Sequence, residues 1–304
     1  MGATGFSVTP LSLGGAYLGS LGPQGFDDDL AIATVIRALE LGINLIDTSP
    51  GYGESERRLG LALEAWYAQG GRREDFVLET KTGTRTRTRD YSYDGTLRSV
   101  EESLQSLKTD YLDIVLVHDP EDLTPVLAPD GAVAALKALK AQGVIRAIGL
   151  GYRQHEAHRR CMETGDFQVS LTHRDFNLLT QTAVQGVLEP AVRHGVAVFN
   201  ASATLNGLLG GRDPYEMVAD DLLPRWMRNV PQEQLDRIHA LWAWCQERNA
   251  SLLAVNMQYV LRERRITSTL VGCATPEQVE EDVAACFAPL PETLWDELHA
   301  DFGL

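Results

Sequence analysis

Short runs of apolar and β-branched residues alternate with longer stretches of helical period from about residue 8 onward. This alternation is typical of parallel strands joined by crossover helices. The clearest predicted strands are Asn44–Asp47, Phe76–Lys81, Ile114–His118, Ala147–Gly151 and Val196–Asn200. Predicted helices include Asp28–Leu41, Tyr93–Leu107 and Ala132–Ala141. Gly42, Gly143 and Gly195 lie between a helix and the next strand, where a left-handed helix terminus is expected.

Three further runs, Leu11–Gly14, Val169–His173 and Thr269–Gly272, bring the predicted strands to eight. Eight β/α units predict an α/β fold of the closed (β/α)8 or TIM barrel type, with residues 1–304 in a single domain, rather than an open doubly wound sheet. The stretch Gly210–Val230 contains several prolines and is predicted to be a long loop. Pro289–Leu304 is predicted to form an acidic C-terminal helix or tail.

The composition excludes several classes of partner. A formal net charge of -15 argues against nucleic acid and anionic membranes, which bind clustered Lys and Arg. The four cysteines form no CxxC pair, so neither a zinc knuckle nor a disulfide framework is indicated. The sequence has no signal-peptide pattern and no apolar run near the roughly 18 residues of a membrane span. We expect a soluble cytoplasmic protein; its oligomeric state cannot be read from these features.

Two histidines raise the question of a metal site. His155 and His158 stand three residues apart in a predicted helix, but no HExxH spacing accompanies them. Solvated surface histidines are the commoner outcome of such a pattern, and we predict no metal site.

Reactive side chains end three successive predicted strands. Active sites of such barrels lie at the C-terminal ends of the strands, and here these ends carry Asp47, Lys81 and His118. Each alone fits a structural role, as half of an ion pair or as a strand-end histidine. An acid, an amine and an imidazole on three successive strands are much less ordinary. Tyr52 follows in a loop with Pro50 and two glycines that can turn back over the barrel mouth.

These four residue types suit proton transfer. A tyrosine with a pKa near 10 is a poor acid or base at neutral pH, and a neighbouring ammonium favours its phenolate. Asp47 would hold Lys81 charged and in place. His118 could donate a hydrogen bond to a reacting oxygen and stabilise charge that develops there.

The segment GINLIDTSPGYGESERRLG, followed by LETKTG and YLDIVLVHDPED, resembles the aldo-keto reductase superfamily. The resemblance extends from LSLGGAYLG to VGCATPEQVEED, nearly the whole chain. Within the superfamily the chain looks most similar to bacterial L-fucose or D-threo-aldose dehydrogenases and plant L-galactose dehydrogenases, with a bacterial pyridoxal dehydrogenase nearby. The resemblance implies a metal-free hydride transfer between a nicotinamide cofactor and a carbonyl carbon or its alcohol. It also implies that Asp47, Tyr52, Lys81 and His118 form the catalytic tetrad.

The sugar branch of the family implies oxidation of a cyclic aldose of the L-fucose, L-galactose or D-arabinose type at C1. The product is a lactone and Tyr52 serves as the base. A carbonyl reductase or pyridoxal-type dehydrogenase with the same tetrad is the alternative enzyme. A cofactor-binding regulatory module is the alternative of another class, because potassium-channel β subunits resemble this family. The residues predicted to line the substrate pocket are Tyr17, Tyr91, Tyr152 and Trp226.

The chain departs from the family where the nicotinamide carboxamide is usually held. Family members present Ser-Asn after strand five, whereas this chain has Gly151 and Tyr152, so Gln154, His173 or Arg153 is expected to substitute. The residues predicted to bind the cofactor are Gln154, Ser202, Leu205, Gly207, Gly272, Thr275, Gln278, Glu281 and Asp282.

The segment after strand eight predicts NAD rather than NADP. In this superfamily it holds the adenosine end, and enzymes that prefer NADP place Lys or Arg there. No Lys or Arg occurs between Ile266 and Leu304, whereas acidic residues such as Glu281 and Asp282 crowd the segment. A 2'-phosphate would meet like charge, and a ribose hydroxyl could donate to these carboxylates. The alternative is a basic residue from elsewhere that reaches the phosphate: Arg212, Arg262 or Arg265.

Overall fold

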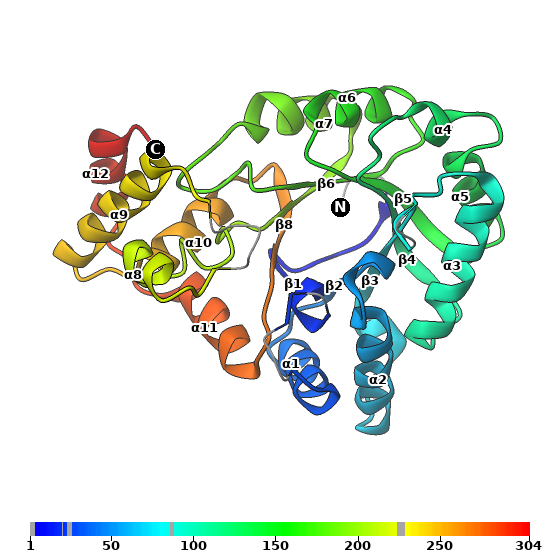
Figure 1. The fold of residues 1–304 in the computed structure, drawn as a ribbon, viewed down its shortest axis with the longest axis horizontal. Helices are drawn as coiled ribbons and strands as arrows, with labels where there is room; N and C mark the ends of the chain where they lie inside the picture. The colour runs from blue at the N-terminus through cyan, green and yellow to red at the C-terminus, as the bar shows by residue number, and fades with distance from the viewer. Residues whose placement is uncertain (1–3, 20, 23–25, 86–87, 224–228) are drawn as a thin grey trace.

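The computed structural model describes residues 4–19, 21–22, 26–85, 88–223 and 229–304. Eight parallel strands close into a barrel in the order β1-β2-β3-β4-β5-β6-β7-β8, with helices around it (Figure 1). The strands are β1 Leu11–Gly14, β2 Leu45–Asp47, β3 Val77–Thr82, β4 Leu112–His118, β5 Ile145–Gly151, β6 Val169–His173, β7 Ala197–Ala201 and β8 Ile266–Val271. The predicted TIM barrel is confirmed, and β8 shows the largest difference in strand bounds, because it begins three residues before the predicted Thr269.

The longer helices connect the strands or follow them. They are α1 Asp28–Glu40, α2 Ser55–Ala68, α3 Tyr93–Leu107, α4 Thr124–Leu127, α5 Ala132–Ala141, α6 His155–Glu163, α7 Glu189–His194, α8 Pro214–Ala219, α9 Gln232–Glu247, α10 Leu252–Arg262, α11 Pro276–Phe287 and α12 Thr293–Phe302. The glycines between a helix and the next strand have the expected positive φ: 86° at Gly42, 77° at Gly143 and 67° at Gly195.

Side chains that alternate along the strands divide the apolar core into two shells. The barrel interior is filled by Leu45, Val77, Ile114, Leu116, Ala147, Val169, Leu171, Phe199 and Leu270. On β3, Val77 belongs to this interior, so Glu79 and Lys81 point inward by the period of two. Thr80 points outward and donates to Glu56 of α2. The interior is therefore apolar in its body and charged near the C-terminal ends of β2 and β3.

The stretch Gly210–Val230 is not a continuous loop, because it contains the helix α8. Pro214 occupies the first turn of α8, and the Asp213 side chain caps the helix by accepting from the backbone N–H of Tyr215. Proline is favoured at this position because its missing N–H would have no helical partner there. Helices α8, α9, α10 and α12 share an apolar cluster with the loop after β7, at the left of Figure 1. The helix predicted near the C-terminus is confirmed as α12.

The histidines of α6 are structural rather than solvated, contrary to the sequence prediction for His158. His158 is fully buried and bonds Ser170 Oγ at 2.7 Å and the Tyr152 carbonyl at 2.8 Å. His155 bonds the buried Asp175 at 2.7 Å. Within the described ranges, no group of three or more His, Cys, Asp or Glu side chains is arranged to hold a metal ion.

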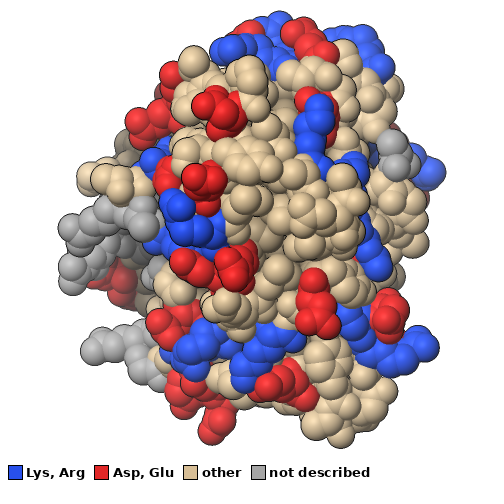
Figure 2. Space-filling view, turned by 90° about the vertical axis from the view of Figure 1, so that its right-hand side faces the viewer, with Lys and Arg blue, Asp and Glu red and all other residues tan. Residues whose placement is uncertain are grey.

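The surface shows no large basic field on the side that lies at the right of Figure 1. Lys and Arg are interspersed with Asp and Glu there (Figure 2). None of the helices in the described part of the chain is long and apolar enough to cross a membrane.

Candidate active site

The C-terminal ends of β2, β3 and β4 bring the four predicted catalytic side chains together. Asp47 ends β2 and His118 ends β4, whereas Lys81 stands one residue before the end of β3. Tyr52 is the last residue of a 3-10 turn, Pro50–Tyr52, which starts where Ser49 Oγ accepts from the Gly51 N–H at 3.1 Å. This turn carries the phenol back over the barrel mouth.

Lys81 lies at the centre of the group, with 1% of its side chain exposed. Its ammonium donates to the Asp47 carboxylate and, at 2.9 Å, to the Thr48 carbonyl. Nζ also lies 4.8 Å from the centroid of the Tyr52 ring. Burial alone would lower the pKa of Lys81, but its neighbours, the Asp47 carboxylate foremost, raise it. The ammonium therefore stays charged.

The phenol of Tyr52 stands between two opposing effects. Burial raises its pKa to about 12, while the Lys81 ammonium acts in the opposite direction. The expected effect of Lys81 is present, but on its own it does not outweigh burial.

His118 is held as a neutral imidazole. Its Nδ1 lies 2.9 Å from Thr84 Oγ1 and 3.1 Å from Ser49 Oγ. Burial, reinforced by the Lys81 charge, lowers the pKa of His118 well below its usual range. Because Ser49 Oγ already accepts from Gly51, its proton is available to Nδ1. We infer that Nδ1 accepts and that Nε2 carries the hydrogen. The imidazole meets the Tyr52 ring edge to face, at 5.6 Å between centroids.

The backbone beside His118 is fixed by three hydrogen bonds. Tyr91 Oη donates to the His118 carbonyl at 2.7 Å, Arg89 donates to the Asp119 carbonyl, and the Asp119 N–H donates to Gly151 at 2.8 Å. Asp119 is held at a φ of 46°, in the left-handed region that non-glycine residues rarely adopt. Its carboxylate comes within 3.8 Å of His118 Nε2. A carboxylate acceptor is thus placed beside the imidazole.

Two of the predicted substrate residues support the site rather than line its cavity. Tyr91 is buried, and its hydroxyl is used on the His118 carbonyl. Tyr152 is partly buried against the core between strands and helices. Trp226 lies outside the described residues, and Tyr17 does line the cavity.

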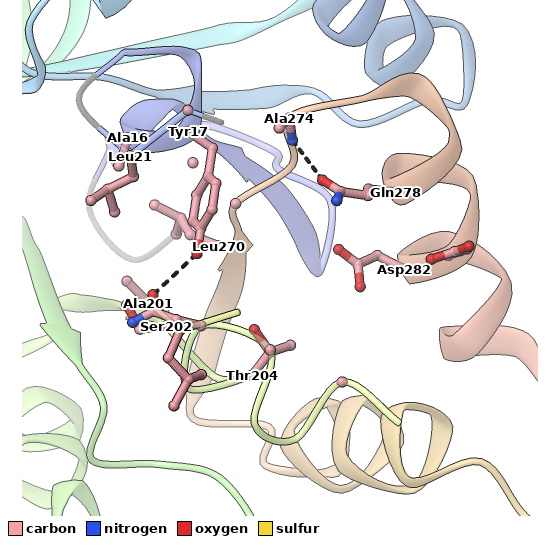
Figure 3. A pocket seen from close by; sticks show the side chains of 18 of the residues that line it. Ala16, Tyr17, Leu21, Ala201, Ser202, Thr204, Leu270, Ala274, Gln278 and Asp282 are labelled. Atoms are coloured by element: carbon pink, nitrogen blue, oxygen red, sulfur yellow. Dashed lines mark hydrogen bonds between the residues drawn. The ribbon is translucent and has the colours of Figure 1, made fainter. Parts of the chain in front are cut away.

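A cavity of about 950 Å³ is lined by Asp47 and Tyr52 at the barrel mouth and by residues in the first turns of α11. Figure 3 shows the part of this cavity between Tyr17, Ser202, Gln278 and Asp282. Its lining includes six predicted cofactor residues: Ser202, Gly207, Gly272, Gln278, Glu281 and Asp282. Tyr17 Oη lies 3.4 Å from Asn206 Oδ1, so the two loops meet across the cavity. The Tyr17 ring packs on Gly272, where a Cβ would stand 2.4 Å from it. A glycine at 272 is therefore needed for this contact.

The other three predicted cofactor residues lie outside this lining. Gln154 is exposed at the start of α6. Leu205 is buried in the cluster formed by α8, α9, α10 and α12. The Thr275 side chain caps α11 by accepting from the Gln278 N–H at 3.3 Å. Among the residues predicted to replace the carboxamide contact, His173 ends β6 close to the barrel mouth, whereas Arg153 is exposed.

The end of the cavity beside α11 is acidic. Glu281 and Asp282 of α11 line it, Asp221 is a third acidic residue of the cavity lining, and none of the described lining residues is Lys or Arg. Burial raises the pKa of Asp282 to about 6, so its carboxylate is mostly ionised at neutral pH. The three arginines considered from sequence have acidic partners outside the lining: Arg212 pairs with Asp220, Arg262 with Glu292 and Arg265 with Glu263.

Sequence reasoning missed four polar residues of this site: Ser49, Thr84, Asp119 and Glu79. A serine before Pro-Gly is a turn signal, which could have identified Ser49. The spacing of two between Glu79 and Lys81 could have placed both inside the barrel. No pattern of neighbouring residues in the sequence shows that Thr84 contacts His118. None shows that the backbone of Asp119 adopts a left-handed conformation.

Comparison with known proteins gives consistent results. The sequence pattern of the aldo/keto reductase family matches residues 10–300. The chain is 33% identical to L-galactose dehydrogenase of Arabidopsis thaliana, over 94% of this chain and 86% of that protein. It is 29% identical to D-threo-aldose 1-dehydrogenase of a Pseudomonas species, over 97% and 94% of the two chains. It is also 29% identical to pyridoxal 4-dehydrogenase of Microbacterium luteolum, over 99% and 96%.

Enzymes of this family are oxidoreductases that use nicotinamide cofactors. The family pattern covers nearly all of the chain, and the structure has the barrel that the resemblance implied. The protein therefore belongs to the aldo/keto reductase family.

Proposed function

We propose that this protein is an NAD-dependent sugar 1-dehydrogenase that oxidises the cyclic hemiacetal of an aldose at C1 to the lactone. The observation that carries the proposal is the meeting of Tyr52, the buried Lys81 ammonium and a neutral His118 at one end of a long cavity. Asp119 adds a carboxylate near Nε2 of His118, and a polyhydroxylated sugar ring could donate hydrogen bonds to that carboxylate.

The cavity fits an extended dinucleotide. It joins the barrel mouth to α11, and its middle is lined by backbone-rich turns at Ser202, Asn206 and Gly207, all with positive φ. When bound, the nicotinamide supplies the acceptor for the hydrogen that leaves C1. The ribose beside α11 would donate to the carboxylates of Glu281 and Asp282.

The four catalytic residues then divide the proton chemistry. Tyr52, as phenolate, accepts the proton of the C1 hydroxyl, and Lys81 stabilises the phenolate charge. His118 donates from Nε2 to the same oxygen, which fixes its direction toward Tyr52. Asp47 keeps the ammonium paired, because an unpaired charge at this depth would be strongly destabilising.

Two alternatives use the same barrel. A carbonyl reductase or pyridoxal-type dehydrogenase would use the same four residues, but Asp119 favours a substrate with several hydroxyl donors over a simple aldehyde. A regulatory module would need the dinucleotide but not the proton-transfer group. The close contacts among Asp47, Tyr52 and Lys81 favour catalysis.

A substrate panel tests the proposed function. With NAD as the oxidant, L-fucose, L-galactose and D-arabinose should be oxidised faster than pyridoxal, and the reduction of simple aldehydes, assayed with NADH as the hydride donor, should also be slower. Asp119→Asn should weaken activity on the best aldose more than on any aldehyde in the panel. No turnover of any aldose would disprove the sugar assignment, and binding of dinucleotide without any turnover would support the regulatory module.

Replacing Tyr52 by Phe should lower kcat by about two orders of magnitude or more while NAD affinity stays similar, because only the proton acceptor is lost.

In the unchanged protein, log kcat for oxidation should rise with pH from neutral toward the pKa of Tyr52, since the phenolate is the active form. Stopped-flow measurements with chemistry rate-limiting give both results. Near-normal turnover by the Phe variant, or a flat pH profile, would exclude Tyr52 as the base.

The Ser49 and Thr84 hydroxyls that face His118 Nδ1 should be needed to keep the imidazole hydrogen on Nε2. Ser49→Ala combined with Thr84→Val leaves Nδ1 without a hydroxyl donor, so we expect kcat to fall by about ten- to a hundredfold. The tautomer can be read by 15N NMR of the imidazole. Thr82→Val is the matched control, because Thr82 Oγ1 has no partner among the described residues. Unchanged kcat and tautomer in the double variant would refute this role.

The acidic end of the cavity should select NAD. Above pH 7, where Asp282 is ionised, kcat/KM should favour NAD over NADP by about tenfold or more. Glu281→Arg should narrow that ratio by supplying a partner for the 2'-phosphate. Glu280→Arg makes the same charge change but faces Arg37 of α1 outside the lining, so it should leave the ratio unchanged. A higher kcat/KM for NADP in the unchanged protein would overturn the assignment.

A further inference from the structure

A second carboxyl group lies inside the barrel beneath the candidate active site. Glu79 stands two residues before Lys81 on β3, so both side chains enter the barrel interior. Glu79 is 0% exposed, and the strand register sets it opposite Asp47 of β2 on one side and Ile114 of β4 on the other. It therefore lies between the charged mouth and the apolar body of the barrel.

The surroundings of Glu79 do not suit a carboxylate. Neither side-chain oxygen accepts a hydrogen bond from any donor in the described residues. The charged groups that act on it are Asp47 and Lys81, and the Lys81 ammonium is bonded to Asp47 and Thr48. An ionised Glu79 would lack donors and would repel Asp47, which is strongly unfavourable in a buried site.

A protonated Glu79 resolves this conflict. Its carboxyl hydrogen can be donated to Asp47, which stands directly opposite Glu79 in the register of β2 and β3. Burial, followed by the Asp47 charge, raises the pKa of Glu79 well above its usual range. Two carboxyl groups that share one proton are a stable arrangement where two carboxylates are not.

We propose that Glu79 is a protonated carboxylic acid that donates to Asp47 and so positions the Asp47 carboxylate against the Lys81 ammonium beneath Tyr52. Glu79 touches neither substrate nor cofactor in this arrangement and acts only through Asp47. It is a positioning residue for the pair that stabilises the Tyr52 phenolate. The kinetic effect of Glu79 rests on the proposed role of Tyr52 as the base. The protonation of Glu79 does not depend on that role.

The direction of the kinetic effect follows from the shared hydrogen bond. The groups that face Tyr52 are Lys81, Asp47, Asp119 and the edge-on His118. Without a hydrogen-bond donor at residue 79, the Asp47 carboxylate keeps its full negative charge and interacts more strongly with the Lys81 ammonium. The ammonium then stabilises the Tyr52 phenolate less. The Tyr52 pKa should then rise, and oxidation should need a higher pH.

Infrared spectroscopy of the intact protein tests the protonation without reference to activity. A carboxylic C=O band that shifts in D2O should be present at neutral pH in the unchanged protein and missing from Glu79→Gln. If the two spectra do not differ in that band, Glu79 is ionised and the proposal is wrong. A Glu79→Gln protein retains a donor and a similar volume, so it is the variant expected to fold without difficulty.

Two variants and a control test the positioning. Glu79→Leu removes the donor and should move the acid limb of the kcat profile up by about one pH unit, while Glu79→Gln should leave it nearly unchanged because its amide donates to Asp47. The control is Ile114→Val, a small repacking at the register partner of Glu79, which should not move the limb. A downward shift in both Glu79 variants would show that a negative charge had been removed. That result, or no shift in either, would overturn the proposal.

The infrared result separates this proposal from the proposed function. If no aldose is oxidised, the same profile can be recorded with any carbonyl substrate found in the panel, where Tyr52 acts as the acid and the alkaline limb moves up in Glu79→Leu. Loss of the sugar assignment therefore leaves the protonation and the pH shift measurable.

Discussion

A lysine ammonium with 1% of its side chain exposed sits at the mouth of this barrel, and a charge at that depth is stable only when it is paired and hydrogen-bonded. The pairing constrains several elements at once. It requires β2 to end in Asp47, the chain to turn so that the Thr48 carbonyl faces inward, and the Tyr52 ring to lie over the ammonium. The short turn that follows Ser49 satisfies the last requirement.

The same charge determines the chemistry of its neighbours. It opposes the effect of burial on the pKa of Tyr52 and helps to lower the pKa of His118, so the imidazole remains neutral. Ser49 serves both the turn and the imidazole, because its oxygen accepts from Gly51 and its proton is available to Nδ1. Rigid strands and one capped turn therefore hold the proposed proton-transfer group beside the long cavity that we propose as the dinucleotide site.

The barrel and the three strand-end residues could be predicted because both rest on local patterns. Parallel buried strands appear as apolar runs, and the reactive residues at their ends interrupt those runs. The sequence does not predict the helix α8 because proline usually interrupts helices, although Pro214 stands in the first turn after a capping Asp213. The burial of His158 depends on a distant partner, Ser170, and no helical pattern shows such a contact.

The environments of the predicted substrate residues also depend on partners that are distant in the sequence. Tyr91 was selected as an aromatic wall, but its hydroxyl is used by the backbone of β4, which lies far away in the sequence. Asp119 and Glu79 gain their chemical character from a strained backbone and from the barrel interior, respectively. Such environments are set by tertiary packing. Patterns in a single sequence can therefore indicate which residues are polar, but not their backbone conformation or protonation state.

In the proposed reaction, hydrogen leaves C1 of an aldose for the bound nicotinamide while Tyr52 takes the hydroxyl proton. The most direct measurement is a reaction of NAD with the best aldose of the panel labelled with deuterium at C1, followed by mass spectrometry of both products. We expect one deuterium in the reduced cofactor, an unlabelled lactone and slower turnover than with the unlabelled sugar. Deuterium retained in the oxidised sugar, with none in the cofactor, would contradict the proposed reaction.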